Sequence, residues 1–430
     1  MPKRIVLLHV AILSVITLPH TYVAEAQSVE APARKVIHSL GIEVRSGFVI
    51  PRRELPMANY ELWKPGGGVF SAHLRYSFRF CPHSVAGRIW NDTYQGIGVG
   101  RYEFFGRARG LRGVEYNFQQ TSARGGILGT PLALYLFQGA RLASFTSRLT
   151  LGYEWNFGVS GPWRPYDSEN NPTQWAVGSR VNALISAGLH LDYSLSPRMS
   201  LIAGATVTHF SNGNTALPNA GLNLTGGRIG LVYDFIDAGR RCVDAETWRE
   251  TQMPDFVRHM SYDIVVFGSQ RKRVADAGEK GAGEKIQLPG LYNVLGISFM
   301  PMYNLSRIVR IGGALDGFYD SSANIRIADD RPVAEQRHAP PSNLSLDRPP
   351  VAKQLALGIS ARAEFAMPFF TVGLGLGTNM LHGGGDMESV YQMLTLKIAL
   401  GGNVFAHVGY SLHNFRDPNF LMLGLGIRIN

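Results

Sequence analysis

Apolar and polar residues alternate one by one along several segments of about ten residues, the length of a membrane-crossing strand. The last of these segments sets Leu421, Leu423, Leu425, Ile427 and Ile429 against Met422, Gly424, Gly426 and Arg428. Successive side chains of a β-strand point to opposite faces, so each segment predicts a strand with one apolar face. The chain is therefore expected to be all-β.

The same alternation is clear in residues 40–50, 72–80, 148–157 and 354–365. A soluble antiparallel sandwich also alternates. Here, however, Arg, Glu and Gly recur on one face of nearly every segment, and 49 of the 430 residues are glycine, above the usual share of about 7%. This pattern favours a transmembrane antiparallel β-barrel over a soluble sandwich.

The first 26 residues have the organisation of a secretory signal peptide. Lys3 and Arg4 precede an apolar run from Ile5 to Leu18, and Ala24-Glu25-Ala26 provides a cleavage site before Gln27. The run is too short for a spanning helix, and no later stretch reaches 18 apolar residues. A secreted chain that crosses the membrane with strands is expected in the bacterial outer membrane, as a multi-pass protein.

The lengths of the connections predict the topology. About 14–16 strands are expected between His38 and Asn430, with both chain ends on the periplasmic side. Short connections occur at Ser196-Pro197, Asn304-Leu305, Met367-Pro368 and Gly401-Gly402, and they alternate with long polar ones at 51–68, 160–178, 270–289 and 321–350. The short ones are expected in the periplasm and the long ones outside.

Two architectures fit this strand count. Residues 27–236 and 237–430 are either the two halves of one barrel or two separate barrels, and we favour one continuous barrel because the alternation persists after His259. Cys81 and Cys242 both lie beside predicted periplasmic ends, where an oxidising compartment permits a disulfide. In two separate barrels these ends would be neighbours, whereas in one large barrel they would lie on opposite sides. A disulfide between them would therefore count against the single barrel.

A candidate site lies at the end of the segment from Ser200 to Asn212. His209 and Ser211 continue its more apolar face, and counting back along the next strand, without a bulge at Gly226-Gly227, places Asn223 on the corresponding face. A serine hydroxyl becomes an effective nucleophile when a base such as an imidazole lies beside it. Its position, where an apolar band meets a polar turn, suits a lipid substrate with a polar head.

The net charge and the absence of known motifs narrow the possible functions. The chain carries a net charge of +10 with a pI near 9.6, which favours an anionic membrane surface as a partner. Its 12 histidines show no metal-ligand spacing, and no GxSxG, HExxH, P-loop or CxxC motif occurs. A soluble hydrolase, a zinc protease and a nucleotide enzyme therefore have no support from the sequence. We predict no metal, no cofactor and no nucleic-acid partner.

The segment His209-Phe210-Ser211-Asn212, together with Pro218-Asn219-Ala220-Gly221-Leu222, resembles the active-site signature of the outer-membrane lipid A 3-O-deacylases, the PagL-like or acyloxyacyl hydrolase family, in a long form. Residues 134–140 and 161–167 also resemble long members, and the resemblance covers roughly residues 38–235. It implies a barrel whose lipid-facing serine esterase site removes an ester-linked acyl chain from the lipid A of lipopolysaccharide, with outer-membrane lipids as its surroundings.

The resemblance also assigns roles by position. Ser211 corresponds to the nucleophile and His209 to its general base, while Asn219 with backbone N–H groups around Gly213 corresponds to the oxyanion hole and Asn212 to its support. The family has a glutamate at the position of Asn223. An amide can orient the imidazole, but it supplies no negative charge to stabilise the histidinium. Two further functions therefore remain open: a catalytically impaired barrel that binds lipid or organises the membrane, and a porin-like channel, since about 16 strands can enclose water.

Two other groups of residues have simpler interpretations. Tyr153, Trp155, Trp163, Tyr166 and Tyr233 are interpreted as members of the aromatic girdle of the barrel. Near the C-terminus, His413-Asn414 and Pro418-Asn419 repeat part of the motif, but residue 415 is Phe where a serine would be needed. This repeat is interpreted as turn chemistry rather than a second site.

Overall fold

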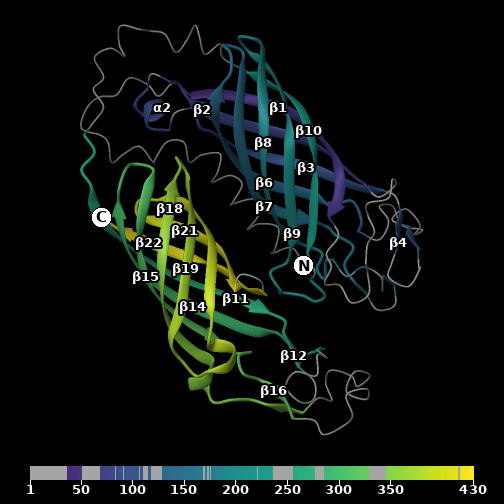
Figure 1. The fold of residues 1–430 in the computed structure, drawn as a ribbon, viewed down its shortest axis with the longest axis vertical. Coiled ribbons are helices and arrows are strands. Elements are labelled where there is room, and N and C mark those ends of the chain that lie inside the picture. The colour runs from purple at the N-terminus through teal and green to yellow at the C-terminus, as the bar shows by residue number, and fades with distance from the viewer. Residues whose placement is uncertain are drawn as a thin grey trace. The chain divides into compact units, whose positions relative to one another are not determined.

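A computed structural model describes most of the chain in two compact units, one within residues 33–253 and one from residue 254 to the end. The described residues are 36–50, 68–82, 84–90, 92–105, 107–109, 115–117, 128–167, 170–171, 174, 176–219, 221–235, 255–276, 285–328, 345–414 and 417–430. The expected signal peptide, Phe415 and Cys242 lie outside these residues. Each unit is a closed antiparallel barrel of eight strands (Figure 1).

The first barrel runs from β1 to β10 in an up-and-down order. Its strands are β1 (Val36–Ile50), β2 (Gly68–Phe80), β3 (Tyr94–Phe105), β6 (Leu132–Ser144), β7 (Leu149–Gly161), β8 (Asn182–Ser196), β9 (Met199–Ser211) and β10 (Leu222–Asp234). The barrel closes where β1 pairs with β10, from Ser39↔Asp234 to Ile50↔Asn223. The turn that joins β9 to β10 lies at the same end of the barrel as the ends of β1 and β7 that lead into the long connections.

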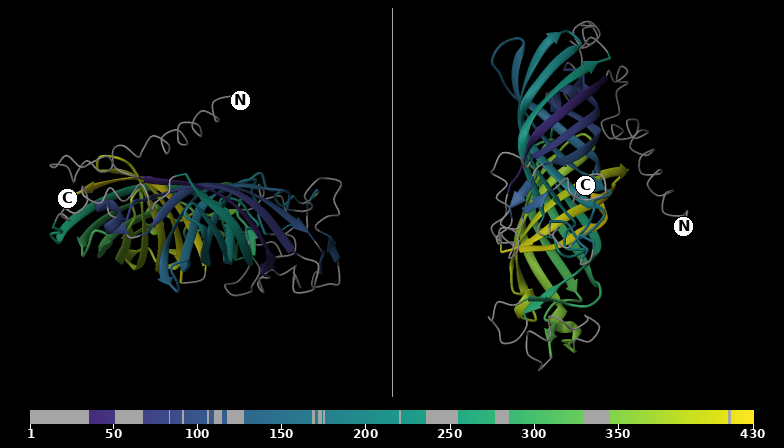
Figure 2. Two further views of the ribbon diagram at one scale, coloured as in Figure 1. Left: turned by 90° about the horizontal axis from the view of Figure 1, so that it is seen from above. Right: turned by 90° about the vertical axis from the view of Figure 1, so that its right-hand side faces the viewer.

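The second barrel has the same plan. Its strands are β11 (His259–Arg271), β14 (Tyr292–Asn304), β15 (Val309–Asp320), β18 (Leu355–Ala366), β19 (Phe370–His382), β20 (Val390–Gly401), β21 (Val404–His413) and β22 (Asp417–Ile429). It closes where β11 pairs with β22, from Tyr262↔Ile429 to Gly268↔Leu423. Figure 2 shows the tilted strands of the barrels from two further sides.

Short elements decorate the strand ends. They are the two-stranded sheets of β4 (Arg107–Arg109) with β5 (Glu115–Asn117), β12 (Val274–Asp276) with β13 (Lys285–Gln287) and β16 (Arg326–Ile327) with β17 (Leu346–Asp347), the helix α2 (Val85–Trp90), and the 3₁₀ turns η4 (Val351–Gln354) and η5 (Gly385–Met387). Within the described residues, no helix combines the length and apolar character needed to cross a membrane.

The expectation of one continuous barrel is wrong, because the strands close as two groups of eight. β1 pairs with β10 along almost its whole length. The backbone groups on this edge of β10 are therefore already hydrogen-bonded, and a later strand cannot pair with them. Alternation within a strand records which face is apolar, and it carries no information on which strand is the neighbour. Cys81 takes part in a disulfide, which agrees with the separate-barrel alternative.

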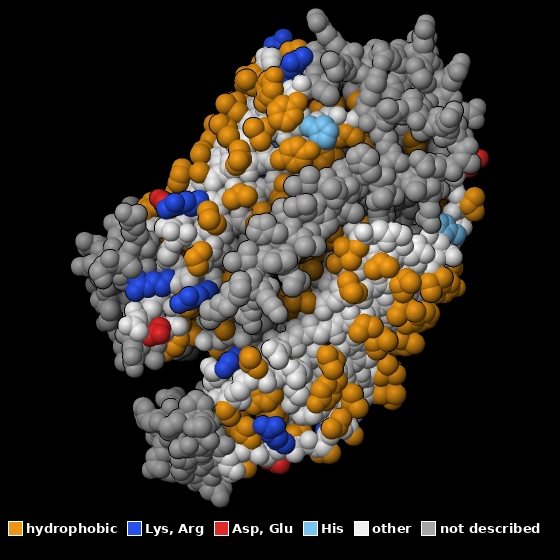
Figure 3. All heavy atoms as spheres, turned by 180° about the vertical axis from the view of Figure 1, so that it is seen from behind, with side chains coloured by type: hydrophobic (Ala, Val, Ile, Leu, Met, Phe, Trp, Pro, Cys, Tyr) orange, Lys and Arg blue, Asp and Glu red, His pale blue; other side chains and the backbone are white. Residues whose placement is uncertain are grey.

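The predicted inside-out pattern of the strands is confirmed. The apolar faces point outward: Ile42 is 58% exposed and Leu74 is 55% exposed, whereas the alternating Glu43 and Arg75 are 2% and 6% exposed. The space-filling view shows apolar side chains spread over the outer surface (Figure 3). An exposed apolar wall around a polar interior is the opposite of a soluble fold, and it suits strands that face lipid.

Both interiors are filled by buried ion pairs. In the first barrel, Glu43 and Glu154 pair with guanidinium groups of Arg45, Arg75 and Arg228. In the second, the pairs join Asp263 and Glu364 to Arg310, Lys397 and Arg428, and Asp316 to Arg362. Eight strands leave an interior just wide enough for side chains. The porin-like alternative assumed about 16 strands around one lumen, and this architecture does not provide that lumen.

Candidate active site

The pairing of β9 with β10 brings the three central site residues together. His209 lies directly opposite Asn223 in the register, and the pairing continues without a bulge through Gly226 and Gly227, as expected. Ser211 is two residues beyond His209 on the same strand, so both side chains stand on the outer face. The alternating residues Thr208 and Phe210 point inward and are 3% and 0% exposed.

The imidazole of His209 is oriented by Asn223. His209 Nδ1 and Asn223 Oδ1 are 2.7 Å apart, within hydrogen-bond distance. An amide oxygen only accepts, so this contact places the ring hydrogen on Nδ1. The Nε2 atom of that tautomer carries a lone pair, as a general base requires.

Phe210, between the two site residues, anchors this part of β9 to the barrel interior. Its ring centroid is 4.9 Å from that of Trp163 and 5.2 Å from that of Tyr102. Trp163 donates its indole N–H to Ser160 Oγ at 2.8 Å and is 2% exposed. The interpretation of Trp163 as an aromatic-girdle residue is therefore wrong, because the connection after β7 folds it inward onto Phe210.

The polar turn after Ser211 is fixed by its own asparagines. The backbone N–H of Asn212 donates to Asn219 Oδ1 at 3.2 Å, and Asn212 Nδ2 donates to the carbonyl of Ala216 at 3.0 Å. Asn219 Nδ2 donates to Asn214 Oδ1 at 3.2 Å. Gly213 has a φ of 63°, a left-handed conformation that favours glycine. Asn212, Gly213 and Asn219 therefore define one rigid turn next to Ser211.

Gly221 belongs to the segment that resembles the family signature, but the sequence assigned it no role in the site. Its φ is 74°, and a Cβ atom on it would come within 2.8 Å of His209 Cε1. Its N–H donates to the carbonyl of Ala176 at 3.0 Å. Ala176 is in turn held by Gln174, a buried side chain whose Oε1 accepts from the N–H groups of Ala176 and Val177. The long connection after β7 thus supports the wall behind the imidazole.

The surroundings of the site on the outer wall are apolar. Ile185 lies opposite His209 and Ala183 lies opposite Ser211 on β8. Val207, the preceding outward residue of β9, is 52% exposed. Among the described residues, no group of three or more His, Cys, Asp or Glu side chains could hold a metal ion. The arrangement is a serine hydroxyl and an imidazole on an apolar outer face.

The repeat near the C-terminus of the chain differs from this site. His413 lies opposite Asp417 in the pairing of β21 with β22, on the face that alternates with the exposed Val404 and Val408. Asn414 has a φ of 50°, and its N–H donates to the carbonyl of Val390 at 2.8 Å. Val390 is the first residue of the neighbouring strand β20, so this bond continues the pairing of β20 with β21. Residues 415–416 lie outside the described residues, and the interpretation of the repeat as turn chemistry stays a prediction.

Comparison with protein families matches both parts of the chain. The model described as lipid A 3-O-deacylase (PagL) matches residues 114–232, and the model described as acyloxyacyl hydrolase, C-terminal domain, matches residues 260–430. The chain belongs to the lipid A 3-O-deacylase family. Members of this family hydrolyse an ester of lipid A. The family match and the apolar outer wall make the chain an outer-membrane protein.

Other comparisons of this deacylase-family chain are distant. Neisserial surface protein A is 10% identical, with a TM-score of 0.28 over 47% of this chain and 99% of its own. An outer-membrane channel from Pseudomonas putida F1 is 8% identical, with a TM-score of 0.19 over 93% and 96%. Omp33 from Acinetobacter baumannii is 8% identical, with a TM-score of 0.16 over 92% and 98%. No curated protein matches the chain.

Proposed function

We propose that this protein is an outer-membrane serine esterase that removes an ester-linked acyl chain from the lipid A of lipopolysaccharide. Ser211 is the nucleophile, His209 is the general base, and Asn223 orients the base. The observation that carries the proposal is the 2.7 Å contact of His209 Nδ1 with Asn223 Oδ1 beside Ser211 on the outer wall. Membership of a lipid A deacylase family supports the choice of substrate.

The reaction follows from these positions. Nε2 of His209 accepts the hydroxyl proton of Ser211 while Oγ attacks the ester carbonyl, and the new C–O bond gives a tetrahedral intermediate. The intermediate collapses with loss of the sugar alkoxide, which takes the proton back from His209. A water molecule then loses a proton to His209 and attacks the acyl-serine ester. The second tetrahedral intermediate releases the fatty acid by breaking its bond to Ser211 Oγ, and Oγ takes the proton back from His209.

The turn after Ser211 provides donors for the oxyanion. Backbone N–H groups around Gly213 lie directly beside the nucleophile in sequence, and the asparagine contacts hold them in place. Asn219 Nδ2 carries two hydrogens, of which one is given to Asn214. The second can be directed to the oxyanion. Donors fixed before the reaction stabilise the developing charge more than mobile ones do.

The position of the site selects a lipid substrate. The catalytic residues face outward from a wall of exposed apolar side chains, at the end of the barrel that carries the long connections. An ester embedded in a membrane reaches this wall by lateral diffusion with its acyl chain against the strands. A soluble short-chain ester would leave the same wall uncovered and is expected to be a poor substrate.

One observation favours a second candidate, a lipid-binding barrel with impaired catalysis. Asn223 is neutral, so the imidazolium that forms during the reaction has no carboxylate partner at this position. In a serine protease triad, an Asp-to-Asn change lowers turnover about 10⁴-fold. Under this alternative the outer wall still binds lipid A, but no acyl chain is released.

Mass spectra of lipid A separate the two candidates. Cells that express the parent protein are expected to contain lipid A that has lost one ester-linked acyl chain. Cells that express Ser211→Ala or His209→Ala are expected to contain unmodified lipid A with the same amount of folded barrel. Ser196→Ala, an exposed serine at the opposite end of β8, serves as the control and should act like the parent. Unmodified lipid A with the parent, in purified vesicles as well as in cells, would favour the impaired barrel.

A further inference from the structure

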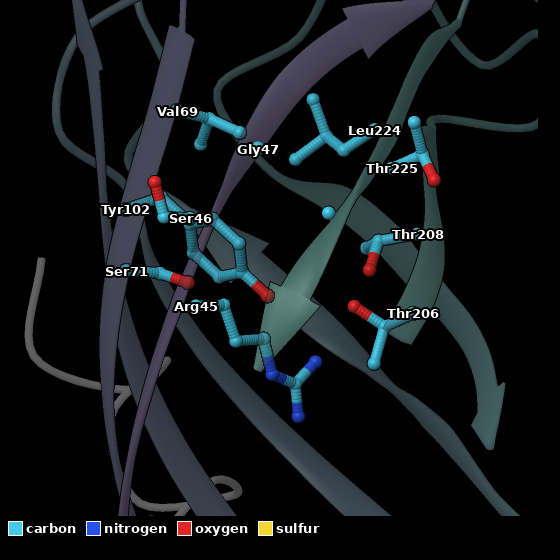
Figure 4. A pocket seen from close by; sticks show the side chains of 11 residues that line it. Arg45, Ser46, Gly47, Val69, Ser71, Tyr102, Thr206, Thr208, Leu224 and Thr225 are labelled. Atoms are coloured by element: carbon cyan, nitrogen blue, oxygen red, sulfur yellow. The ribbon is translucent and has the colours of Figure 1, made fainter. Parts of the chain in front are cut away.

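A small cavity lies inside the first barrel, on the inner side of the wall that carries the active site. Its lining includes Arg45, Ser71, Tyr102, Thr206 and Thr208. Thr208 and Leu224, which both line the cavity, form the pair adjacent to His209 and Asn223 in the pairing of β9 with β10. The cavity and the active site therefore lie on opposite faces of the same part of the sheet. Figure 4 shows the hydroxyl groups of Tyr102, Thr206 and Thr208 and the guanidinium of Arg45 turned toward this space.

Two buried polar groups that line the cavity lack a protein partner. Arg45 is 6% exposed and Tyr102 is 2% exposed. Among the described residues, neither Nη2 of Arg45 nor the hydroxyl of Tyr102 has a hydrogen-bond partner. Arg45 pairs with Glu43 through Nε at 2.5 Å, and its side chain lies on the lining of the cavity (Figure 4). A buried donor without an acceptor is costly, especially on a charged group.

The ion-pair network around the cavity carries a surplus of positive charge. Arg45, Arg75 and Arg228 face only two carboxylates, Glu43 and Glu154. At the other end of the strands the balance is reversed, because Asp192 and Asp234 face one guanidinium, that of Arg79. The surplus of positive charge is therefore confined to the end of the interior that holds the cavity. Burial of an unbalanced charge is strongly unfavourable unless a counter-ion accompanies it.

We propose that this cavity binds one monovalent anion of the size of chloride, held by Arg45 Nη2 and Tyr102 OH. The space open to the centre of a water-sized sphere is about 20 Å³, and one water molecule needs at least about 10–15 Å³ by the same measure. The cavity therefore holds one small occupant. A water molecule could satisfy the two donors, but it could not offset the surplus charge, whereas a halide does both.

The hydroxyl groups nearby fit the same occupant. Thr206 and Ser71 present O–H groups on the lining, and Ser71 Oγ is 2.9 Å from His73 Nε2. No carboxylate is part of the lining. The rest of the lining includes the apolar side chains of Val69 and Leu224. Its polar groups are hydroxyl groups and one guanidinium, which attract an anion and repel a cation. The anion stabilises the folded barrel, because it binds the folded state and not the unfolded chain.

The first test is crystallographic. Crystals of the full chain grown with sodium bromide in place of sodium chloride are expected to show an anomalous peak within contact distance of Arg45 and Tyr102. The peak should weaken in Tyr102→Phe and vanish in Arg45→Gln. Density for water alone at this position in the parent, with bromide present, would overturn the proposal.

The second test measures thermal unfolding of the full chain in detergent, in chloride and in gluconate at equal ionic strength. Chloride is expected to raise the midpoint of the parent by about 2 °C or more, and Arg45→Gln should lose this difference. Ser196→Ala, an exposed serine at the far end of β8 that is not part of the cavity lining, is the control and should respond like the parent. An equal chloride response in Arg45→Gln would contradict the proposal. If Arg45→Gln does not fold, the bromide map of Tyr102→Phe decides.

Discussion

Replacement of Asn223 by aspartate tests how much a negative charge beside His209 would add to the reaction rate. The two side chains have the same length, and Asn223 Oδ1 is already 2.7 Å from His209 Nδ1. Asn223→Asp therefore leaves the geometry in place and adds one negative charge beside the imidazole. The charge acts only when the imidazole is protonated, which occurs as Ser211 attacks the ester. It should thus stabilise the transition state more than the ground state.

The expected gain follows from the distance between the two groups. Two unit charges about 4 Å apart attract by about 4 kcal/mol at an effective dielectric constant of about 20. Water at the membrane edge reduces this value, because Asn223 is only partly buried. We expect about 1.4–2.8 kcal/mol, which corresponds to a 10- to 100-fold rise in turnover. Asn223→Leu, which removes the acceptor, is expected to lose activity about 100-fold or more.

The assay is the initial rate of fatty-acid release from purified lipopolysaccharide in mixed micelles at saturating substrate. The heat-modifiable migration of the barrel on a gel checks that each variant is folded. A folded Asn223→Asp that is tenfold slower than the parent would refute the reasoning. It would mean that the amide nitrogen of Asn223 faces the imidazole, or that another group carries out its role.

Three further outcomes are expected. Gly221→Ala should lower turnover at least tenfold, because its Cβ would lie 2.8 Å from His209 Cε1. Gly227→Ala, within the strand that follows, has its nearest contact at 3.8 Å and should keep the parent's turnover. The activity of both variants, with equal folded amounts, checks this. Ile229→Arg places a charge on the lipid face and should destabilise the barrel by about 2–4 kcal/mol in urea-driven unfolding from lipid vesicles. Glu154→Gln should lower the free energy of unfolding by about 3–5 kcal/mol in the same measurement, because it leaves buried guanidinium groups without their carboxylate. If Ile229→Arg were as stable as the parent, the lipid-facing wall would be contradicted, and if Glu154→Gln were, the ion-pair network would be.

The sequence predicts the strands of this fold because their signal is local. A period of two along β9 and β10 determines which residues face lipid, and it correctly placed His209, Ser211 and Asn223 on one outer face. Closure of the barrels is a property of distant strands. Nothing within β10 distinguishes β1 from a later strand as its partner, so the choice between one barrel and two could not be made from alternation.

The residues that hold the site in place could not be identified from the sequence, for a similar reason. Trp163 and Gln174 belong to a connection whose path back onto Phe210 is decided by tertiary packing. Gly221 was visible as a turn residue, but its closeness to the imidazole depends on the register and on its left-handed φ. The residues to which we assign the chemistry carry a recognisable sequence pattern, whereas the residues that position them are common types whose role depends on their place in the fold.

Covalent labelling of the purified full chain tests the central claim most directly. A fluorophosphonate that carries a long alkyl chain reacts irreversibly with an activated serine, and peptide mapping by mass spectrometry locates the adduct. The account predicts one adduct per chain, on Ser211, with loss of lipid A deacylation in proportion to labelling, and no adduct in Ser211→Ala or His209→Ala. Deacylation that persists after Ser211 is fully labelled, or an inactivating adduct on a different residue, would contradict it.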